Sequence, residues 1–226
     1  MDYGAIWNRE LDRNGLQLVH SELKGRNPAP PDALVECVGW SALKLARCGI
    51  PSYLPERGRV LEIGCGPGFN LLALSAACGT DVRLYGVDPS ERMIELSTRV
   101  CRVCERITTS CCDIEEVAAR HGGEFDLIFE CIVFQHLRLA EVARIFRAAR
   151  KLLHPEGRFV FQMLRADSPR VRRWNGPEED RPVPCMRGYT EAEVRAMLQI
   201  AGFDFWGFTA RTVDGDWFLC VQEGDS

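Results

Sequence analysis

The sequence has no long apolar run, and no stretch approaches the roughly 20 apolar residues that a membrane-spanning helix requires. Its first residues, Met1 to Gly4, also lack the basic start and apolar segment of a secretory signal. An excess of positive charge is missing as well: the formal net charge of -4 offers no overall attraction to nucleic-acid phosphates or anionic lipid. We therefore expect a cytoplasmic protein that does not bind membranes and for which nucleic acid is a disfavoured partner.

Cysteine, in contrast, is abundant, with 11 residues. An odd number of cysteines without a secretory signal indicates reduced thiols, so we expect no structural disulfide. Four thiolates could reach zinc from Cys101, Cys104, Cys111 and Cys112, but neighbouring residues of a strand point to opposite faces. We predict no metal and interpret these cysteines as small apolar side chains, with a zinc site as the alternative.

Length and composition indicate one ordinary globular domain, with 226 residues of which 46% are hydrophobic and 27% charged. From Arg59 onward, short apolar runs alternate with helical patterns, which is the succession typical of a parallel sheet. The expected strands are residues 60–63, 82–87, 107–110, 125–129, 158–163, 205–212 and 217–222. Asp214 and Gly215 predict a hairpin between the last two. The predicted fold class is α/β: a doubly wound, seven-stranded, mostly parallel sheet whose last strand is antiparallel, with helices on both faces.

We expect a single domain, residues 1–226, made of four segments. They are an N-terminal helical cap (1–57), a ligand-binding core (58–164), a lid-like insertion (165–188) and a C-terminal helix with a hairpin (189–226). The insertion is rich in proline and arginine and matches neither a helix nor a strand. Loops of this length inside a compact domain are uncommon, and they are usually functional lids or disordered segments.

Helical patterns fill the rest of the chain. Residues 139–153 carry apolar side chains at a period of 3.6, and we expect residues 154–157 to end that helix. Thr190 and Glu193 form a capping box that opens a helix to about residue 200. In the cap, helices are expected around residues 6–18 and 34–48, with a proline-rich loop over 25–31.

The strongest functional pattern is the segment Val60 to Gly68, where a buried strand runs into a glycine-rich turn and then an apolar helix. Glycines let the backbone approach a ligand and adopt positive φ, and the helix N-terminus offers unpaired N–H groups. Asp88 stands 20 residues beyond Gly68 at the end of the next strand, where a carboxylate can accept both ribose hydroxyls. The pattern therefore predicts a nucleoside site.

The same turn argues against a nicotinamide or flavin site. The dinucleotide pattern G-x-G-x-x-G, counted from Gly64 and Gly66, would place its third glycine where this chain has Phe69. Glu62, two residues before the first glycine, suits a cationic ammonium better than a pyrophosphate.

These motifs resemble those of the class I S-adenosylmethionine-dependent methyltransferases, whose first motif is a strand followed by E-x-G-x-G-x-G, here Glu62 to Gly68. The later motifs of that superfamily are matched in order by residues 85–90 with Met93, 112–114, 125–130, 133–137 and 152–159. In the last of these, Glu156 replaces the usual glycine. The resemblance implies a Rossmann-like fold, S-adenosyl-L-methionine as cofactor and S-adenosyl-L-homocysteine as product.

The resemblance also implies which residues bind the cofactor. Asp88, the acid of the second motif, would bind the ribose, Met93 would pack on adenine, and Asp113 would accept a hydrogen bond from the adenine amino group. The full predicted set is Tyr3, Trp7, Glu62, Gly64, Cys65, Gly66, Gly68, Asp88, Pro89, Met93, Asp113, Ile114 and Glu130. Tyr3 and Trp7 look like the aromatic lead-in that closes over the cofactor in many small-molecule members. Two alternatives stay open, Asp113 as a helix N-cap and Met93 as core filler.

Methyl transfer from a sulfonium is an in-line displacement, so positioning and desolvation supply much of the acceleration and a general base is optional. His136 is the candidate base because imidazole titrates near neutral pH, and Glu130 is the second candidate catalytic residue. Both also have purely structural interpretations. Candidate substrate contacts in the insertion are Arg172, Arg173 and Trp174.

We expect a small-molecule acceptor whose nucleophilic atom is oxygen, nitrogen or carbon. The segment Glu130 to Val133 lacks the [N/D/S]-P-P-[Y/F] motif of enzymes that methylate exocyclic base amines, which argues against adenine N6 chemistry. The alternatives are a protein or RNA acceptor, and a catalytically inactive protein that binds the cofactor as a scaffold.

Overall fold

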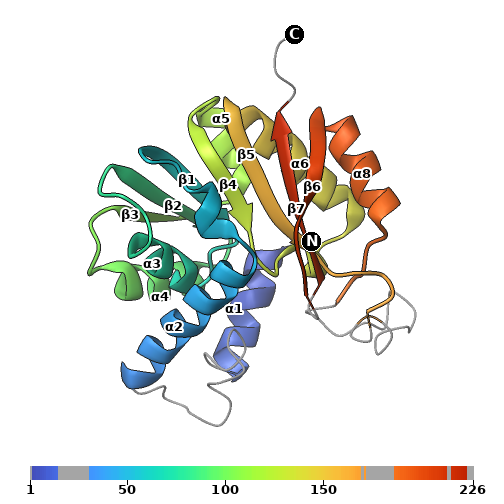
Figure 1. Ribbon diagram of the computed structural model, residues 1–226. Helices are drawn as coiled ribbons and strands as arrows, with labels where there is room; N and C mark the ends of the chain where they lie inside the picture. Colours follow the sequence, from blue (N-terminus) through green and yellow to red (C-terminus); the bar gives the residue numbers. More distant parts are fainter. Residues whose placement is uncertain (1, 15–30, 169–170, 172–185, 213–214, 223–226) are drawn as a thin grey trace.

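The computed structural model describes residues 2–14, 31–168, 171, 186–212 and 215–222 (Figure 1). Seven strands form one sheet, and the first five of them in the chain are mutually parallel, while β7 pairs antiparallel with both neighbours. From one edge to the other the order is β3 (Ile107–Cys111), β2 (Val82–Asp88), β1 (Gly58–Ile63), β4 (Phe125–Glu130), β5 (Leu153–Met163), β7 (Gly215–Gln222) and β6 (Phe203–Thr212). The predicted fold class is confirmed.

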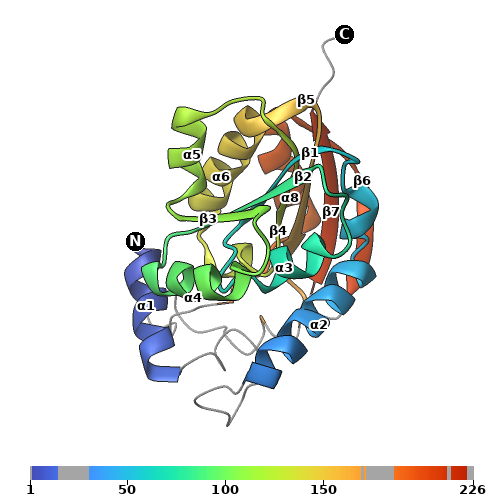
Figure 2. The same ribbon diagram turned by 90° about the vertical axis from the view of Figure 1, so that its left-hand side faces the viewer.

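Helices cover both faces of this sheet (Figures 1 and 2). One face carries α5 (Ile114–Arg120), α6 (Leu139–Leu152) and α8 (Glu191–Ile200), which pack over a core that contains Phe146, Phe159 and Phe161. The other face carries α2 (Pro31–Arg47), α3 (Phe69–Ser75) and α4 (Glu91–Cys101), and α1 (Tyr3–Asn14) packs against α4. A short 3-10 helix, η3 (Ile50–Tyr53), links α2 to β1.

The strand order reverses at the centre of the sheet. The chain moves outward from β1 through β2 to β3 and then returns to place β4 on the other side of β1. In open α/β sheets a crevice for ligands forms at such a switch point, outside the carboxyl ends of the strands. The turn after β1 and the loop after β4 meet there, because a Cβ on Gly64 would lie 2.5 Å from Val133 Cγ2.

Element boundaries differ from expectation in several places, and the starts of β5 and α2 are two examples. β5 begins at Leu153, directly after α6, although we expected residues 154–157 to separate helix from strand. Leu153 has extended backbone angles and pairs with Phe125, and a register shift between Phe125 and Leu127 absorbs the extra residues. α2 starts at Pro31, inside the expected loop, because the first turn of a helix needs no N–H from proline.

Other local predictions hold. Glu193 N donates to Thr190 Oγ1 and Thr190 N donates to Glu193 Oε2, which is the expected capping box of α8. β6 and β7 pair as an antiparallel hairpin, although Asp214 of its turn lies outside the described residues, as do residues 15–30 of the cap. Among the described residues, no helix combines the length and the apolar character needed to cross a membrane.

Candidate functional site

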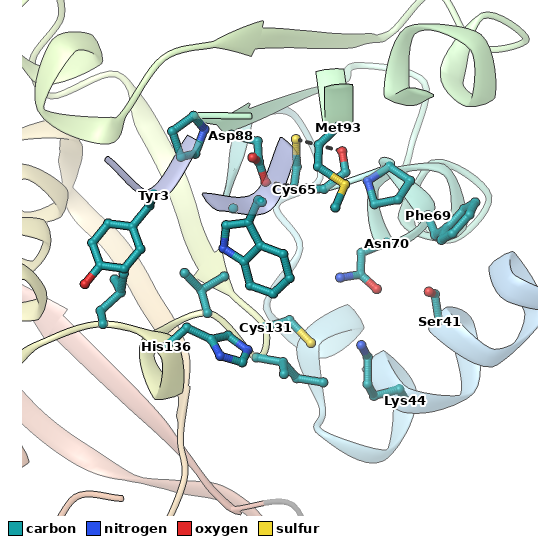
Figure 3. Close-up of a pocket in the computed structure, with 18 residues that line it drawn as sticks. Tyr3, Ser41, Lys44, Cys65, Phe69, Asn70, Asp88, Met93, Cys131 and His136 are labelled. Carbon is teal, nitrogen blue, oxygen red and sulfur yellow. Dashed lines mark hydrogen bonds between the residues drawn. The ribbon is translucent and has the colours of Figure 1, made fainter. Parts of the chain in front are cut away.

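A cavity of about 230 Å³ lies at the switch point of the sheet (Figure 3). Its walls come from α1, α2, the glycine turn after β1, the start of α3, the end of β2 with the start of α4, and the loop after β4. The predicted residues among its lining are Tyr3, Trp7, Gly64, Cys65, Gly66, Asp88, Pro89, Met93 and His136. The fold thus gathers residues that are far apart in the sequence around one pocket.

The glycine turn adopts backbone angles that only glycine accepts easily. φ is 65° at Gly64, 49° at Gly66 and 80° at Gly68, which precedes α3 as its N-cap. A Cβ on Gly68 would lie 2.6 Å from Cys101 Sγ, whereas a Cβ on Gly66 would have no protein atom within 4 Å. Gly66 therefore borders the open space of the pocket, and Gly68 fits α3 against α4.

This difference predicts unequal costs for adding a methyl group within the turn. Gly66→Ala should lower the free energy of unfolding by about 1 kcal/mol, the cost of a positive φ at alanine. Gly64→Ala adds a clash with Val133 to the same strain, so we expect a loss of about 3 kcal/mol. Urea unfolding of the two variants measures both values, and equal losses would contradict the Val133 contact.

Asp88 ends β2 and ties the glycine turn to α4. Its Oδ2 accepts from Gly66 N at 3.0 Å, and its Oδ1 accepts from Ser90 N at 2.9 Å. Burial raises the pKa of this carboxyl to about 6, although both N–H donors oppose the shift. Each oxygen keeps a second lone pair, so the carboxylate can accept two further hydrogen bonds from a ligand.

Glu62 lies beneath the pocket wall and is 1% exposed. Asn70, in the first turn of α3, donates from Nδ2 to Glu62 Oε1 at 2.6 Å. Oε2 has no hydrogen-bond partner among the described residues. Burial raises the pKa of Glu62 to about 8, against the opposing effects of Asn70 and Lys44. A donor that enters beside Asn70 would satisfy the unpaired oxygen.

The buried acid makes stability depend on pH. In the unfolded chain Glu62 loses its proton above its ordinary pKa of 4.5, whereas in the folded protein it keeps the proton up to about pH 8. The free energy of unfolding therefore falls as the pH rises from 4.5 toward about 8. Glu62→Gln removes this linkage, and we expect the stability loss between pH 5 and pH 8 to shrink by about 2 kcal/mol. Urea unfolding at several pH values tests this, with the exposed Glu105→Gln as control. An unchanged slope in Glu62→Gln would refute it.

Glu130, at the end of β4, is fully buried and does not line the cavity. Its Oε2 accepts from Val133 N at 2.7 Å, and its Oε1 accepts from Gln162 N of β5 at 2.8 Å. Burial raises the pKa of this carboxyl to about 8. The side chain holds the loop after β4 against β5, which is a positioning role.

The loop after β4 supplies one wall of the pocket. Ile132 has a positive φ of 66°, which is unusual for a β-branched residue, and it lines the cavity with Cys131 and Val133. His136 ends the short 3-10 helix η4 (Phe134–His136), and its ring meets Trp7 edge-on at 5.2 Å between centroids. Tyr189 supports the loop through its hydroxyl, which shares its one proton between the Leu137 carbonyl at 2.9 Å and the Phe134 carbonyl at 3.1 Å.

Polar contacts hold helix α1 against the rest of the domain beside the pocket. Ser90 Oγ donates to Asn8 Oδ1 at 2.7 Å, and Arg92 of α4 forms an ion pair with Asp12 at 3.1 Å. The Tyr3 hydroxyl donates to Glu141 of α6. These contacts hold Tyr3 and Trp7 on the pocket wall. Figure 3 shows Tyr3 there.

Several predicted residues lie elsewhere. Asp113 is exposed and caps α5 by accepting from Glu116 N at 2.9 Å, while Ile114 is 2% exposed within the core. Neither lines the cavity. The predicted substrate contacts Arg172, Arg173 and Trp174 lie outside the described residues.

The sequence reasoning missed four polar residues of the pocket. They are Ser41, Lys44, Asn70 and Cys131. Asn70 could have been suspected from its place in the helix that follows the glycine turn, but the two residues of α2 carry no motif. Among the described residues, no group of three or more histidine, cysteine or acidic side chains is arranged to hold a metal ion.

The geometry defines a doubly wound α/β protein with a ligand pocket between a glycine turn, an acid at the end of β2 and the loop after β4. A family model described as a methyltransferase domain matches residues 60–157, the segment that contains this turn and this acid. This match makes residues 60–157 similar to a methyltransferase domain, and it covers less than half of the chain.

Individual relatives are distant. A ubiquinone biosynthesis O-methyltransferase of Aromatoleum aromaticum is 31% identical over 107 residues, which cover 47% of this chain and 44% of that protein. The chain spans less than half the length of the curated relatives it matches. An S-adenosylmethionine-dependent methyltransferase from Clostridium acetobutylicum has the same fold, with a TM-score of 0.65, 15% identity and coverage of 92% and 98% of the two chains. Magnesium protoporphyrin IX methyltransferase from Synechocystis PCC 6803, solved with bound S-adenosylhomocysteine, gives a TM-score of 0.58, 19% identity and coverage of 83% and 82%.

Proposed function

We propose that this protein transfers the methyl group of S-adenosylmethionine to a small-molecule acceptor by in-line displacement. The observation that carries the proposal is the pocket itself, which joins Asp88 and the glycine turn on one side to His136 on the other. Relatives that act on small molecules support the acceptor class, since they include a ubiquinone biosynthesis enzyme and a magnesium protoporphyrin IX methyltransferase.

The residues of the pocket fit this cofactor. Asp88 has acceptor capacity for the two ribose hydroxyls, and Pro89 with Met93 offers an apolar surface for adenine. Glu62 has an unpaired buried oxygen that suits an ammonium, and Gly66 leaves space in the pocket for the ligand. The bound cofactor supplies an electrophilic methyl group on a sulfonium.

The chain's own residues then orient and shield the reaction. Trp7 and Tyr3 of α1 cover the pocket and exclude water, which favours displacement at a charged centre. His136 takes the proton of a hydroxyl or ammonium acceptor, and Glu130 fixes the loop that carries His136. Within this proposal, residues 1–57 act as a cap, residues 165–188 act as a lid, and Arg172, Arg173 and Trp174 contact the acceptor.

Calorimetry with S-adenosylhomocysteine, followed by transfer of a labelled methyl group to a panel of phenols, amines and carboxylic acids, tests the proposal. We expect binding and transfer to at least one of these small acceptors. Binding without any transfer would favour a scaffold, and transfer only to RNA or protein would favour the alternative acceptors. Absence of binding would refute the proposal.

A further inference from the structure

Two polar side chains of α2 enter the pocket from a helix that no motif describes. Ser41 and Lys44 are three residues apart and therefore lie on one face of α2, and both line the cavity (Figure 3). Ser41 is 4% exposed, and Lys44 is partly buried. Both precede residue 60, so they lie outside the segment that the methyltransferase family model matches.

The ammonium of Lys44 has a weak partner. Among the described residues, its hydrogen-bonding neighbour is the thiol of Cys131, and burial raises the pKa of that thiol to about 11, so the sulfur is uncharged at neutral pH. Burial opposes the charged form of Lys44, but its interactions with Cys131 and Glu62 raise its pKa. Lys44 therefore keeps its charge, and a neutral thiol is a poor acceptor for it. A carboxylate oxygen would be a much stronger one.

The pocket has two chemically different sides. Asp88 and Met93 form one side, and Asn70 with Ser41 and Lys44 forms another (Figure 3). A nucleoside whose ribose binds Asp88 would extend its amino-acid end past the glycine turn toward Asn70. That end carries an ammonium and a carboxylate. The ammonium, placed beside Asn70, would favour the ionised form of Glu62, and ionised Glu62 then repels the carboxylate.

We infer that Lys44, with Ser41 beside it, binds the carboxylate of the cofactor's amino-acid end, which leaves Glu62 for the ammonium. This inference rests on the proposed function. On binding, the carboxylate replaces the Cys131 thiol as acceptor from the Lys44 ammonium, and the Ser41 hydroxyl donates to the same group. Lys44 thereby selects ligands that keep the carboxylate.

Three ligands that differ only at this end test the assignment by calorimetry. S-adenosylhomocysteine has both charged groups, its decarboxylated analogue S-adenosyl-3-thiopropylamine lacks the carboxylate, and 5′-methylthioadenosine lacks the whole amino-acid end. We expect the wild-type protein to bind S-adenosylhomocysteine at least about 10-fold more tightly than the decarboxylated analogue, since charged hydrogen bonds are strong. Lys44→Met should abolish this preference, and Ser41→Ala should reduce it.

Matched controls separate this role from a structural one. Lys151→Met changes an exposed lysine of α6 and should leave all three affinities unchanged. Lys44→Met should bind 5′-methylthioadenosine as the wild-type protein does, and Lys44→Arg should restore part of the preference. Should Lys44→Met lose all three ligands, or keep the preference, the assignment of Lys44 is wrong. If the wild-type protein binds 5′-methylthioadenosine but binds the two longer ligands equally well, the inference about Lys44 is wrong and the proposed function stands. If the wild-type protein binds none of the three ligands, the proposed function itself is wrong.

Discussion

Replacing Asp88 with asparagine is expected to weaken S-adenosylhomocysteine binding by about 1,000-fold, because two charge-assisted hydrogen bonds to the ribose are lost together. The substitution also creates a local conflict. Both oxygens of Asp88 accept backbone N–H groups, from Gly66 and Ser90, so either orientation of the amide points its NH2 at a donor. Calorimetry measures the loss. In the wild-type protein, affinity should also fall as pH drops through about 6, where Asp88 takes up a proton.

Asp126 provides the matched control. Its Oδ2 accepts from the backbone N–H of Arg59 at 2.8 Å, so it is another carboxylate that holds a main-chain donor, but it does not line the pocket. Asp126→Asn should lower stability and leave ligand affinity unchanged. If folded Asp88→Asn binds S-adenosylhomocysteine within about 10-fold of the wild-type protein, Asp88 does not hold the ribose.

Substitution of His136 by alanine should reduce kcat about 100-fold with the acceptor that the panel identifies, if that acceptor gives up a proton. The rate should also lose its dependence on pH near neutrality, because imidazole is the group that can take up the proton there. Affinity for S-adenosylhomocysteine should change little. A variant that only disturbed the wall formed with Trp7 would instead raise KM across the whole pH range.

The control for this experiment is His121→Ala. His121 is an exposed histidine that pairs with Glu124 at 3.1 Å and lies outside the pocket lining. Its variant should keep the wild-type rate and pH profile. Unchanged turnover of His136→Ala at every pH would remove His136 as the base and leave positioning as the source of acceleration.

The features that sequence predicted best are those set by near neighbours in the chain. The strand, turn and helix from Val60 onward follow from apolar runs and glycines, and the cap of α8 follows from Thr190 and Glu193. The start of β5 was misplaced because it depends on pairing with Phe125 of another strand. Lys44 was missed for the same reason, since its place in the pocket depends on how α2 packs across α3.

For two acidic residues, Asp113 and Glu130, the same sequence pattern is compatible with either a ligand contact or a structural role. The residues around Asp113 fit both a ligand contact and a helix cap, and the cap is the interaction that the structure contains, completed by Glu116. Glu130 was expected beside the reaction, and it does neighbour the pocket loop. Its oxygens, however, are occupied by Val133 and by Gln162 of β5, a strand partner that only the folded sheet reveals.

The strained backbone at Ile132 has a consequence for how the protein can evolve. A β-branched side chain at positive φ costs of order 1–3 kcal/mol, and glycine would remove most of that cost. The fold therefore stays below the stability that its own architecture would allow. Selection for heat resistance alone would replace Ile132 early, whereas selection for what the pocket binds preserves the side chain that forms its wall.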